Sequence, residues 1–330
     1  MKRFFFTILS FIMMLFILAS CGGQKPEKIR LAEVTRSVFY TPLYIALSEG
    51  LFKEEGLDVE LKTTWGGDKT MTALLSNGAD IALVGSETSI YVNAQGASDP
   101  VINFAQLTQT DGTFLVARND AGHFSWDDLK NKTFLGQRKG GMPQMAGEFV
   151  LKQKGIDPKK DVDLIQTIDF ANIANSFASG TGDYVQLFEP QASIFEREGI
   201  GRIVASFGKE SGRIPYTTFM AKQSYLTKNE EAVEKFTRAV YKAQQWVETH
   251  SAKEAAESIQ DYFKDTELSI IESSIERYKQ QRSFALEPVL AEKEWNQLQT
   301  IMDEAGELPK RTPHQKLVNT KIAEKVTKNH

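Results

Sequence analysis

The chain is poor in the residues that form covalent cross-links and metal sites. It has one cysteine among 330 residues, at position 21, so an intramolecular disulfide is excluded. Its four histidines are scattered, which gives no basis for a metal site, and each is expected to be a surface residue. They are His123, His250, His314 and His330. We therefore expect no metal ion and no other cofactor.

Catalytic and nucleotide-binding signatures are also missing. The sequence has no G-x-S-x-G elbow, no G-x-x-x-x-G-K-[ST] loop and no H-E-x-x-H motif. Gly180-Thr181-Gly182 lacks the third glycine of a dinucleotide fingerprint. The formal net charge is −4 at pH 7, and a mildly acidic chain has no basic field for nucleic acid. Nothing in these motifs favours an enzyme.

Long apolar runs are absent after residue 20, and the one before it has the form of a secretory signal. Lys2 and Arg3 precede an apolar run over 4–18, which ends in the small residues 18–21. The run is too short for a comfortable membrane span. Residues 1–20 are therefore predicted to be a signal peptide.

The residues Leu18-Ala19-Ser20-Cys21 also resemble a bacterial lipobox, in which the cysteine is lipidated and becomes the mature N-terminus. The alternative is an ordinary signal peptide with a chance cysteine. A lone cysteine directly after the apolar run has no packing role, so lipidation of Cys21 is favoured. Residues 21–26 then form a short tether, and the acyl chains anchor the protein to the extracytoplasmic face of the cell membrane.

The stretch from Ile29 to Leu61 predicts a strand, a helix and a second strand. The residues over 29–34 give a short apolar strand without helical spacing. Pro42 sits where a helix begins, and Gly50 provides its C-terminal stop. A βαβ unit of this kind makes a parallel sheet, with the loop after the first strand at the carboxyl edge.

Short strands and helices continue to alternate, which predicts an α/β fold with helices on both faces of mostly parallel sheets. Further strands are predicted over 81–84, 101–107, 114–117, 133–135, 162–168, 184–188, 203–207 and 216–220. Four helices are predicted over 231–249, 253–263, 268–280 and 291–305, and they are expected to brace a lobe. The polar tail over 309–330 is expected to be mobile.

Polar and aromatic residues follow the predicted strands. Ligands of open α/β sheets bind outside the carboxyl ends of the strands, where glycines and helix N-termini offer N–H groups. Aromatic walls favour a flat or partly apolar solute. The candidates in the first half are Ser37, Phe39, Tyr40, Trp65, Gly66, Gly67, Gly85, Ser86 and Glu87. Those in the second half are Arg138, Lys139, Gly140, Gly141, Met142, Phe188 and Glu189.

Several candidates have a purely structural alternative. Phe39 and Tyr40 would also serve as a staple that holds their loop to the next helix. Ser86 would serve as an N-cap, and Glu189 as an acidic group at a helix N-terminus. Trp65, between polar residues and two glycines, favours a pocket over a core.

The charge of the ligand stays open. One set of residues suggests an anion: Arg36, Arg138, Lys139 and Arg213. Another set suggests amino or ring N–H donors: Glu87, Asp111 and Glu189. A zwitterion or a heteroaromatic amine is as compatible with this mixture as a sulfonate.

Four segments make the chain resemble the periplasmic-binding-protein-like solute receptors of ABC importers. They are TPLYIALSEGLFKEEGLDVEL at 41–61, ALLSNGADIALVGSETS at 73–89, DDLKNKTF at 127–134 and GTGDYVQLFEP at 180–190. The resemblance covers 29–305 and points to the nitrate/sulfonate/taurine group and its relatives for thiamine pyrimidine precursors, the NMT1/THI5-like family.

The resemblance implies a two-lobed, type II periplasmic-binding-protein-like fold that closes on its solute like a hinged trap. Lobe 1 would comprise 27–111 and 216–308, and lobe 2 would comprise 112–215. Carried over by position, the ligand-binding residues are Phe39, Tyr40, Trp65, Gly66, Ser86, Glu87, Arg138, Lys139, Gly140, Gly141, Met142, Tyr184, Glu189 and Tyr216. The protein would be a monomeric receptor that delivers a sulfonate-, taurine- or nitrate-like solute to an ABC permease and its ATPase.

Three other functions stay open. The solute could instead be a thiamine pyrimidine precursor. Eukaryotic relatives of the family make thiamine pyrimidine, so an enzyme is a second alternative, although those relatives resemble Cys-rich, iron-using sites that this chain lacks. The third is a receptor that signals to a membrane kinase.

Overall fold

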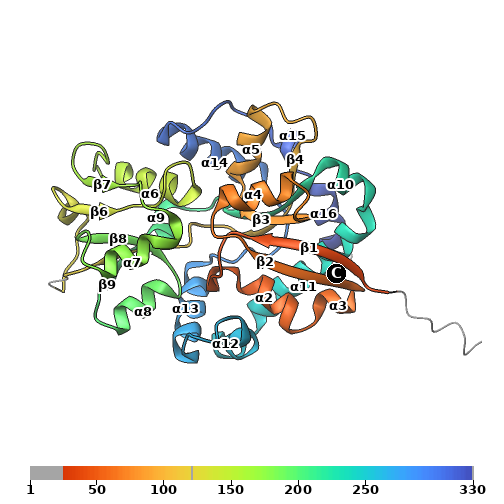
Figure 1. The fold of residues 1–330 in the computed structure, drawn as a ribbon, viewed down its shortest axis with the longest axis horizontal. Helices are drawn as coiled ribbons and strands as arrows, with labels where there is room; N and C mark the ends of the chain where they lie inside the picture. Colours follow the sequence, from red (N-terminus) through yellow and green to blue (C-terminus); the bar gives the residue numbers. More distant parts are fainter. Residues whose placement is uncertain (1–24, 120–121, 329–330) are drawn as a thin grey trace, which may run out of the picture.

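The strands of the protein form two five-stranded sheets, seen in the computed structural model, which describes residues 25–119 and 122–328 (Figure 1). The first sheet has the order β2-β1-β3-β10-β4 and the second β7-β6-β8-β5-β9. The strands of the first sheet are β1 (Glu27–Glu33), β2 (Leu57–Thr63), β3 (Ile81–Gly85), β4 (Val101–Thr108) and β10 (Thr217–Lys222). Those of the second sheet are β5 (Thr113–Ala117), β6 (Thr133–Leu135), β7 (Asp163–Ile165), β8 (Tyr184–Phe188) and β9 (Arg202–Ser206).

Both sheets are mixed, as in two-lobed α/β proteins. In the first sheet β1 pairs in parallel with β2 and β3, whereas β10 pairs antiparallel with β3 and β4. In the second sheet β6 pairs in parallel with β7 and β8, whereas β5 pairs antiparallel with β8 and β9. In each sheet four strands therefore run in one direction, and only β10 or β5, the strand that follows an interlobe crossing, runs in the opposite direction. The expectation of mixed, mostly parallel sheets is confirmed.

The chain passes twice between the sheets. It leaves β4 at Thr108 and enters β5 at Thr113, and it returns after β9 and α9 (Phe207–Ser211) into β10. We call the unit on the first sheet lobe 1 and the unit on the second sheet lobe 2. Lobe 2 lies at the left of Figure 1 and lobe 1 at the right.

The predicted strand–helix–strand unit at the N-terminal side is confirmed. The residues of β1 and β2 pair from Glu27 with Leu57 to Glu33 with Thr63. Between them lie α2 (Thr41–Ser48), with Pro42 in its first turn, and α3 (Leu51–Glu54). Gly50 adopts a φ of +74°, which an L side chain rarely adopts, so a glycine separates the two helices.

Helices cover both sheets. Those before β10, besides α2, α3 and α9, are η1 (Val38–Tyr40), α4 (Gly67–Leu75), α5 (Glu87–Ala94), η2 (Trp126–Leu129), α6 (Met142–Gln153), η3 (Phe170–Asn172), α7 (Ile173–Ala178) and α8 (Gln191–Arg197). Those after β10 are α10 (Gln223–Lys228), α11 (Glu230–Thr249), α12 (Ala252–Ile259), η4 (Gln260–Tyr262), α13 (Leu268–Gln281) and α14 (Glu292–Ala305). The four predicted C-terminal helices are α11 to α14, and α11 packs against α2 and α3. No helix among the described residues is both long and apolar enough to cross a membrane.

The segment that was expected to be a mobile tail is folded. It forms α15 (His314–Leu317) and α16 (Thr320–Lys328), and α16 lies against α11 and β4. Leu317 and Val326 are fully buried, and Val318 makes a β-bridge with Asn103. Apolar side chains on one face of α16 find a partner in lobe 1, so the expectation is wrong.

The histidines differ in their surroundings. His123 is exposed and His250 stacks on Trp246, but His314 is buried, and its Nε2 lies 2.9 Å from the Leu290 carbonyl oxygen. The expectation that each is a surface residue is therefore wrong for His314, which helps to hold the C-terminal segment. His330 lies outside the described residues.

Candidate functional site

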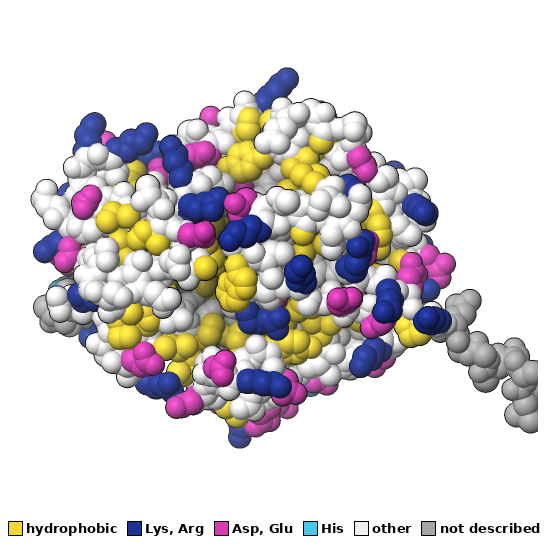
Figure 2. Space-filling model, viewed as in Figure 1, with side chains coloured by type: hydrophobic (Ala, Val, Ile, Leu, Met, Phe, Trp, Pro, Cys, Tyr) yellow, Lys and Arg dark blue, Asp and Glu magenta, His cyan; other side chains and the backbone are white. Residues whose placement is uncertain are grey.

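A cavity of about 390 Å³ lies between the lobes. The loops that follow β1, β2, β3 and β6 line it, and so does Phe188 at the end of β8. This is the edge at which open α/β sheets bind ligands. Charged side chains of both signs gather on the surface where the two lobes meet (Figure 2).

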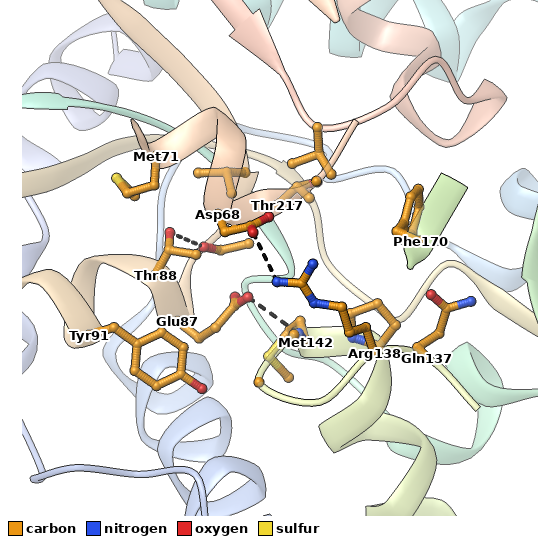
Figure 3. Close-up of a pocket in the computed structure, with 18 of the residues that line it drawn as sticks. Asp68, Met71, Glu87, Thr88, Tyr91, Gln137, Arg138, Met142, Phe170 and Thr217 are labelled. Carbon is orange, nitrogen blue, oxygen red and sulfur yellow. Dashed lines mark hydrogen bonds and ion pairs between the residues drawn. The ribbon is translucent and has the colours of Figure 1, made fainter. Parts of the chain in front are cut away.

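The lobes touch across this cavity. The Met142 N–H of lobe 2 donates to Glu87 Oε1 of lobe 1 at 3.2 Å, and Arg138 Nη2 reaches Asp68 Oδ2 at 2.9 Å (Figure 3). The Arg138 and Asp68 side chains are 44% and 54% exposed, so their ion pair contributes at most about 1 kcal/mol. The Ser37 hydroxyl donates to the Glu189 carbonyl at 2.6 Å on the buried side. The arrangement is a closed one, with lobe-to-lobe bonds on both sides of the site.

Glu87 is the buried charged group of the cavity wall. It is 4% exposed, at the N-terminus of α5. Its Oε2 is buried without a hydrogen-bond partner among the described residues. Burial raises the pKa of Glu87 to about 7, and the N–H groups of its own backbone and of Met142 oppose that rise. The carboxylate lies so close to Gly85 that a Cβ at that position would be 2.2 Å from Oε2.

Three tyrosines of the wall lie near this carboxylate. Burial raises the pKa of Tyr40, Tyr91 and Tyr216, and the charge of Glu87 adds to each rise. Tyr40 and Tyr216 are buried, whereas Tyr91 is half-buried beside Glu87 on α5 (Figure 3). Phe170 and Phe188 add aromatic surface from lobe 2. The cavity thus combines one acidic group with several ring faces.

Nine of the fourteen ligand-binding residues carried over by position line the cavity, and so do the further candidates Gly67, Gly85 and Phe188. The nine are Tyr40, Gly66, Glu87, Arg138, Lys139, Gly140, Gly141, Met142 and Tyr216. The 138–142 loop comes to the cavity because it follows β6 and leads into α6, as the pattern of two glycines and Pro143 suggests. Lys139 is also 3.6 Å from Glu307, so its charge is partly compensated.

Two predicted aromatic residues lie in a core and not at the cavity. Phe39 is fully buried in η1 and packs on Tyr40, Phe188, Tyr216 and Tyr278. It supports the wall from behind, and its ring partners other than Tyr40 lie on β8, next to β10 and on α13 and not on the next helix, α2, so these contacts match neither a pocket role nor the staple alternative. Tyr184 belongs to the lobe 2 core and contacts Phe124.

Ser86 and Glu189 have structural partners. The Ser86 hydroxyl donates to the Pro215 carbonyl and makes no cap bond to α5. The Glu189 carboxylate accepts from the backbone N–H and the hydroxyl of Ser193, both at 2.9 Å, and pairs with Arg277 at 3.0 Å. Glu189 is therefore an acidic group at the start of α8, as its structural alternative proposed, and it does not line the cavity.

Trp65 lies outside the cavity wall. Its side chain is 46% exposed and its φ is +59°, an unusual conformation for a residue with a Cβ. The loop after β2 does reach the cavity through Gly66 and Gly67. The loop after β2 therefore contributes to the cavity wall through its two glycines, and the Trp65 indole is not part of that wall.

Replacement of Trp65 by Ala is expected to change solute affinity less than two-fold, because the ring does not line the cavity. A stacked ring would instead contribute ~1–3 kcal/mol. Isothermal titration with the solute that co-purifies with the chain measures the difference, with Tyr91→Ala as the variant that should weaken binding. A ten-fold loss in Trp65→Ala would place the indole on the ligand.

Sequence reasoning missed several wall residues. They are Asp68, Met71, Thr88, Tyr91, Gln95, Gln137 and Phe170, among others. Glu87 and Tyr91 on α5 and Gln95 at its C-cap are spaced by four residues, so a helical face that starts at Glu87 would have found two of the missed residues. Phe170 offered no such signal, because it sits in η3 between two elements of lobe 2.

Two of the earlier expectations concern other kinds of site. Cys21, the predicted lipidation site, lies outside the described residues. Among residues 25–119 and 122–328, no group of three or more His, Cys, Asp or Glu side chains is placed to hold a metal ion.

Comparison with solved structures gives the class of fold. The alkanesulfonate-binding protein SsuA from Xanthomonas axonopodis pv. citri, bound to MOPS, has a TM-score of 0.72 at 17% identity over 90% of this chain and 100% of that one. The periplasmic nitrate-binding protein NrtA from Synechocystis PCC 6803 has a TM-score of 0.72 at 18% identity over 92% and 89%. The desulfurization enzyme DSZB also shares the fold, with a TM-score of 0.65 at 12% identity over 92% and 99%. The chain therefore has the two-lobed periplasmic-binding-protein fold.

The sequence comparisons give the family. The model of the NMT1-like family matches residues 22–260. A Bacillus subtilis (strain 168) protein named "Putative binding protein YtlA" is 69% identical over 326 residues, which is 98% of each chain. The chain belongs to the NMT1-like family.

Proposed function

We propose that this protein is the extracytoplasmic solute receptor of an ABC importer. It captures a small organic solute between its lobes and delivers it to a membrane permease that works with an ATPase. The observation that carries the proposal is the cavity of about 390 Å³, to which both lobes contribute walls. A solute that contacts both lobes favours the closed arrangement, and closure gives the permease a surface to recognise.

The anchor belongs to the same proposal. Lipidation of Cys21, after removal of residues 1–20, holds the receptor at the extracytoplasmic face of the membrane as a monomer. The first strand begins at Glu27, so the five residues 22–26 separate it from the acylated cysteine. At roughly 3.3–3.6 Å for each extended residue, this tether keeps the lobes close to the permease.

The solute class is the open part of the proposal. A sulfonate-, taurine- or nitrate-like solute is supported by the similarity in fold to the proteins SsuA and NrtA. A thiamine pyrimidine precursor is supported by a feature of the cavity. The free oxygen of Glu87 accepts a hydrogen bond, and an amino group or a ring N–H provides one where nitrate does not.

An enzyme of the same fold is the rival function. The fold alone does not separate binding from catalysis, because the enzyme DSZB shares it. The 69% identical relative is named as a binding protein, which favours the receptor. A receptor returns its solute unchanged, so chromatography of the solute after incubation with the protein separates the two functions.

A single solute is expected to co-purify with the chain from Gly22 onward, which retains every described residue. After removal by partial unfolding, adding it back raises the melting temperature. At a hundred times Kd the stabilisation is about 2.7 kcal/mol. Mass spectrometry of the released solute and differential scanning fluorimetry measure both effects. A chain that yields no solute and shows no shift across sulfonates, taurine, nitrate and pyrimidines would count against the receptor function.

A further inference from the structure

The cavity has an imbalance of charge. Its charged wall residues are Asp68, Glu87, Arg138 and Lys139. Arg138 pairs with Asp68 at 2.9 Å, and Lys139 lies 3.6 Å from Glu307. Glu87 has no basic partner within 4 Å among the described residues, and it is the most buried of the four. The charge that remains for a ligand is therefore negative.

Two features of the position of Glu87 stabilise its ionised form and oppose the burial that raises its pKa to about 7. A carboxylate at a helix N-terminus is stabilised by the helix dipole, and Met142 donates a backbone N–H to one of its oxygens. The other oxygen is buried without a partner, which is costly unless a donor arrives. A bound group with N–H donors completes this site, whereas an anion would be repelled by it.

The aromatic residues around Glu87 also favour a cationic group over an anion. Tyr40, Tyr91 and Tyr216 line the cavity near the carboxylate, and the faces of tyrosine rings attract cations. Phe170 and Phe188 lie opposite, on lobe 2. Rings of this kind also cover a flat, apolar body.

We infer that the solute is an organic cation, with a positively charged nitrogen group bound by Glu87 and the tyrosines and a flat apolar body between the aromatic residues. This inference rests on the proposed function, since it names the solute class of that cavity. It separates this chain from a receptor for nitrate or a simple alkanesulfonate. Gly85 belongs to the same arrangement, because a side chain there would displace the carboxylate.

Three probes of nearly equal shape test the charge. Benzamidine is a cation, benzamide is neutral with N–H donors and benzoate is an anion. Differential scanning fluorimetry of the chain from Gly22 onward, freed of co-purifying solute, is expected to show a shift for benzamidine at concentrations up to ~10 mM. Benzamide should give a smaller shift and benzoate none. Equal or larger stabilisation by benzoate, or no shift with benzamidine, would overturn the inference.

Glu87→Gln removes the charge and keeps the size. It is expected to weaken benzamidine binding by about ten- to a hundred-fold, the usual worth of a hydrogen bond to a charged group, and to abolish the preference over benzamide. Glu148→Gln is the matched control. It changes a buried carboxylate of lobe 2 that accepts from Gln144 and Gln166 and does not line the cavity. An unchanged preference in Glu87→Gln would overturn the inference.

The two proposals fail differently. If the co-purifying solute is an anion and benzoate binds, the cation inference is wrong and the receptor function stands. If a cation binds and is chemically altered with turnover, the receptor function is wrong and the assignment of Glu87 stands.

Discussion

A chain that ends at Leu308 is expected to lose about 5 kcal/mol or more of its free energy of unfolding. Removal of 309–330 takes away the buried side chains of Leu317, Ile322 and Val326, each worth about 1.5–3 kcal/mol. It also breaks hydrogen bonds to the rest of lobe 1. Such a loss is comparable with the whole stability of many domains, about 5–15 kcal/mol.

The hydrogen bonds explain why the loss extends beyond the removed residues. The Trp295 indole N–H donates to the Thr312 carbonyl at 2.9 Å, and the Asn103 amide donates to the Leu317 carbonyl at 2.9 Å. Trp295 and Asn103 are both fully buried, so truncation leaves the indole N–H and one N–H of the Asn103 amide without protein partners, while the amide keeps its bond to the Ser89 hydroxyl. An unsatisfied buried donor costs about 1–3 kcal/mol.

Urea unfolding followed by circular dichroism measures the effect. Leu317→Ala provides a milder change and is expected to cost about 2–5 kcal/mol. Lys321→Ala, on the exposed side of α16, serves as the control and should change the midpoint little. A truncated chain with the midpoint of the full one would show that the segment is the peripheral tail that its polar composition suggested.

Much of the fold was accessible from local pattern. The β1–α2–β2 unit followed from the apolar strand at 29–34, Pro42 at a helix start and Gly50 at its end, because each of these signals acts within a few residues. The tail was misjudged for a different reason. Ile322, Ala323 and Val326 are spaced as one helical face, but their burial depends on α11, about 80 residues earlier in the chain.

The site was less accessible because it depends on contacts between lobes. The edges of the sheets were predicted, and with them Glu87 and the 138–142 loop. The sequence does not say to which side of a loop a side chain points. Phe39 and Trp65 were therefore both predicted to line the cavity, whereas the structure buries Phe39 in a core and leaves the Trp65 side chain half exposed outside the cavity. Tyr216 reached the wall through the second crossing, which brings residues from distant parts of the chain together.

Replacement of Arg277 by Met is expected to cost about 3 kcal/mol in the free energy of unfolding. Its Nε lies 3.0 Å from Glu189 Oε1, where α13 meets α8 of lobe 2. The Glu189 side chain is fully buried and that of Arg277 is 31% exposed. Removing one member of a buried pair leaves an uncompensated charge, which costs about 3–5 kcal/mol, and the partial exposure places this pair at the lower end.

The loss should depend on pH in a defined direction. Burial raises the pKa of Glu189, and the Arg277 charge opposes that rise. Without Arg277 the pKa rises further. A carboxyl whose pKa is higher in the folded state does not lower the free energy of unfolding while it is protonated in both states, which holds below its unfolded pKa of about 4.3. The deficit of Arg277→Met relative to the parent chain is therefore smallest near pH 4 and grows as the pH rises through the folded pKa of Glu189.

Urea unfolding at several pH values tests both statements, and two further variants separate charge from packing. Glu189→Gln combined with Arg277→Met removes both charges and is expected to recover most of the loss at pH 7, because no uncompensated carboxylate remains. Arg197→Met breaks the exposed interlobe pair with Glu267, and it should cost at most about 1 kcal/mol. If Arg277→Met loses the same stability at pH 4 as at pH 8, the cause is lost packing on Phe114, which the guanidinium covers at 5.5 Å, and not the buried charge.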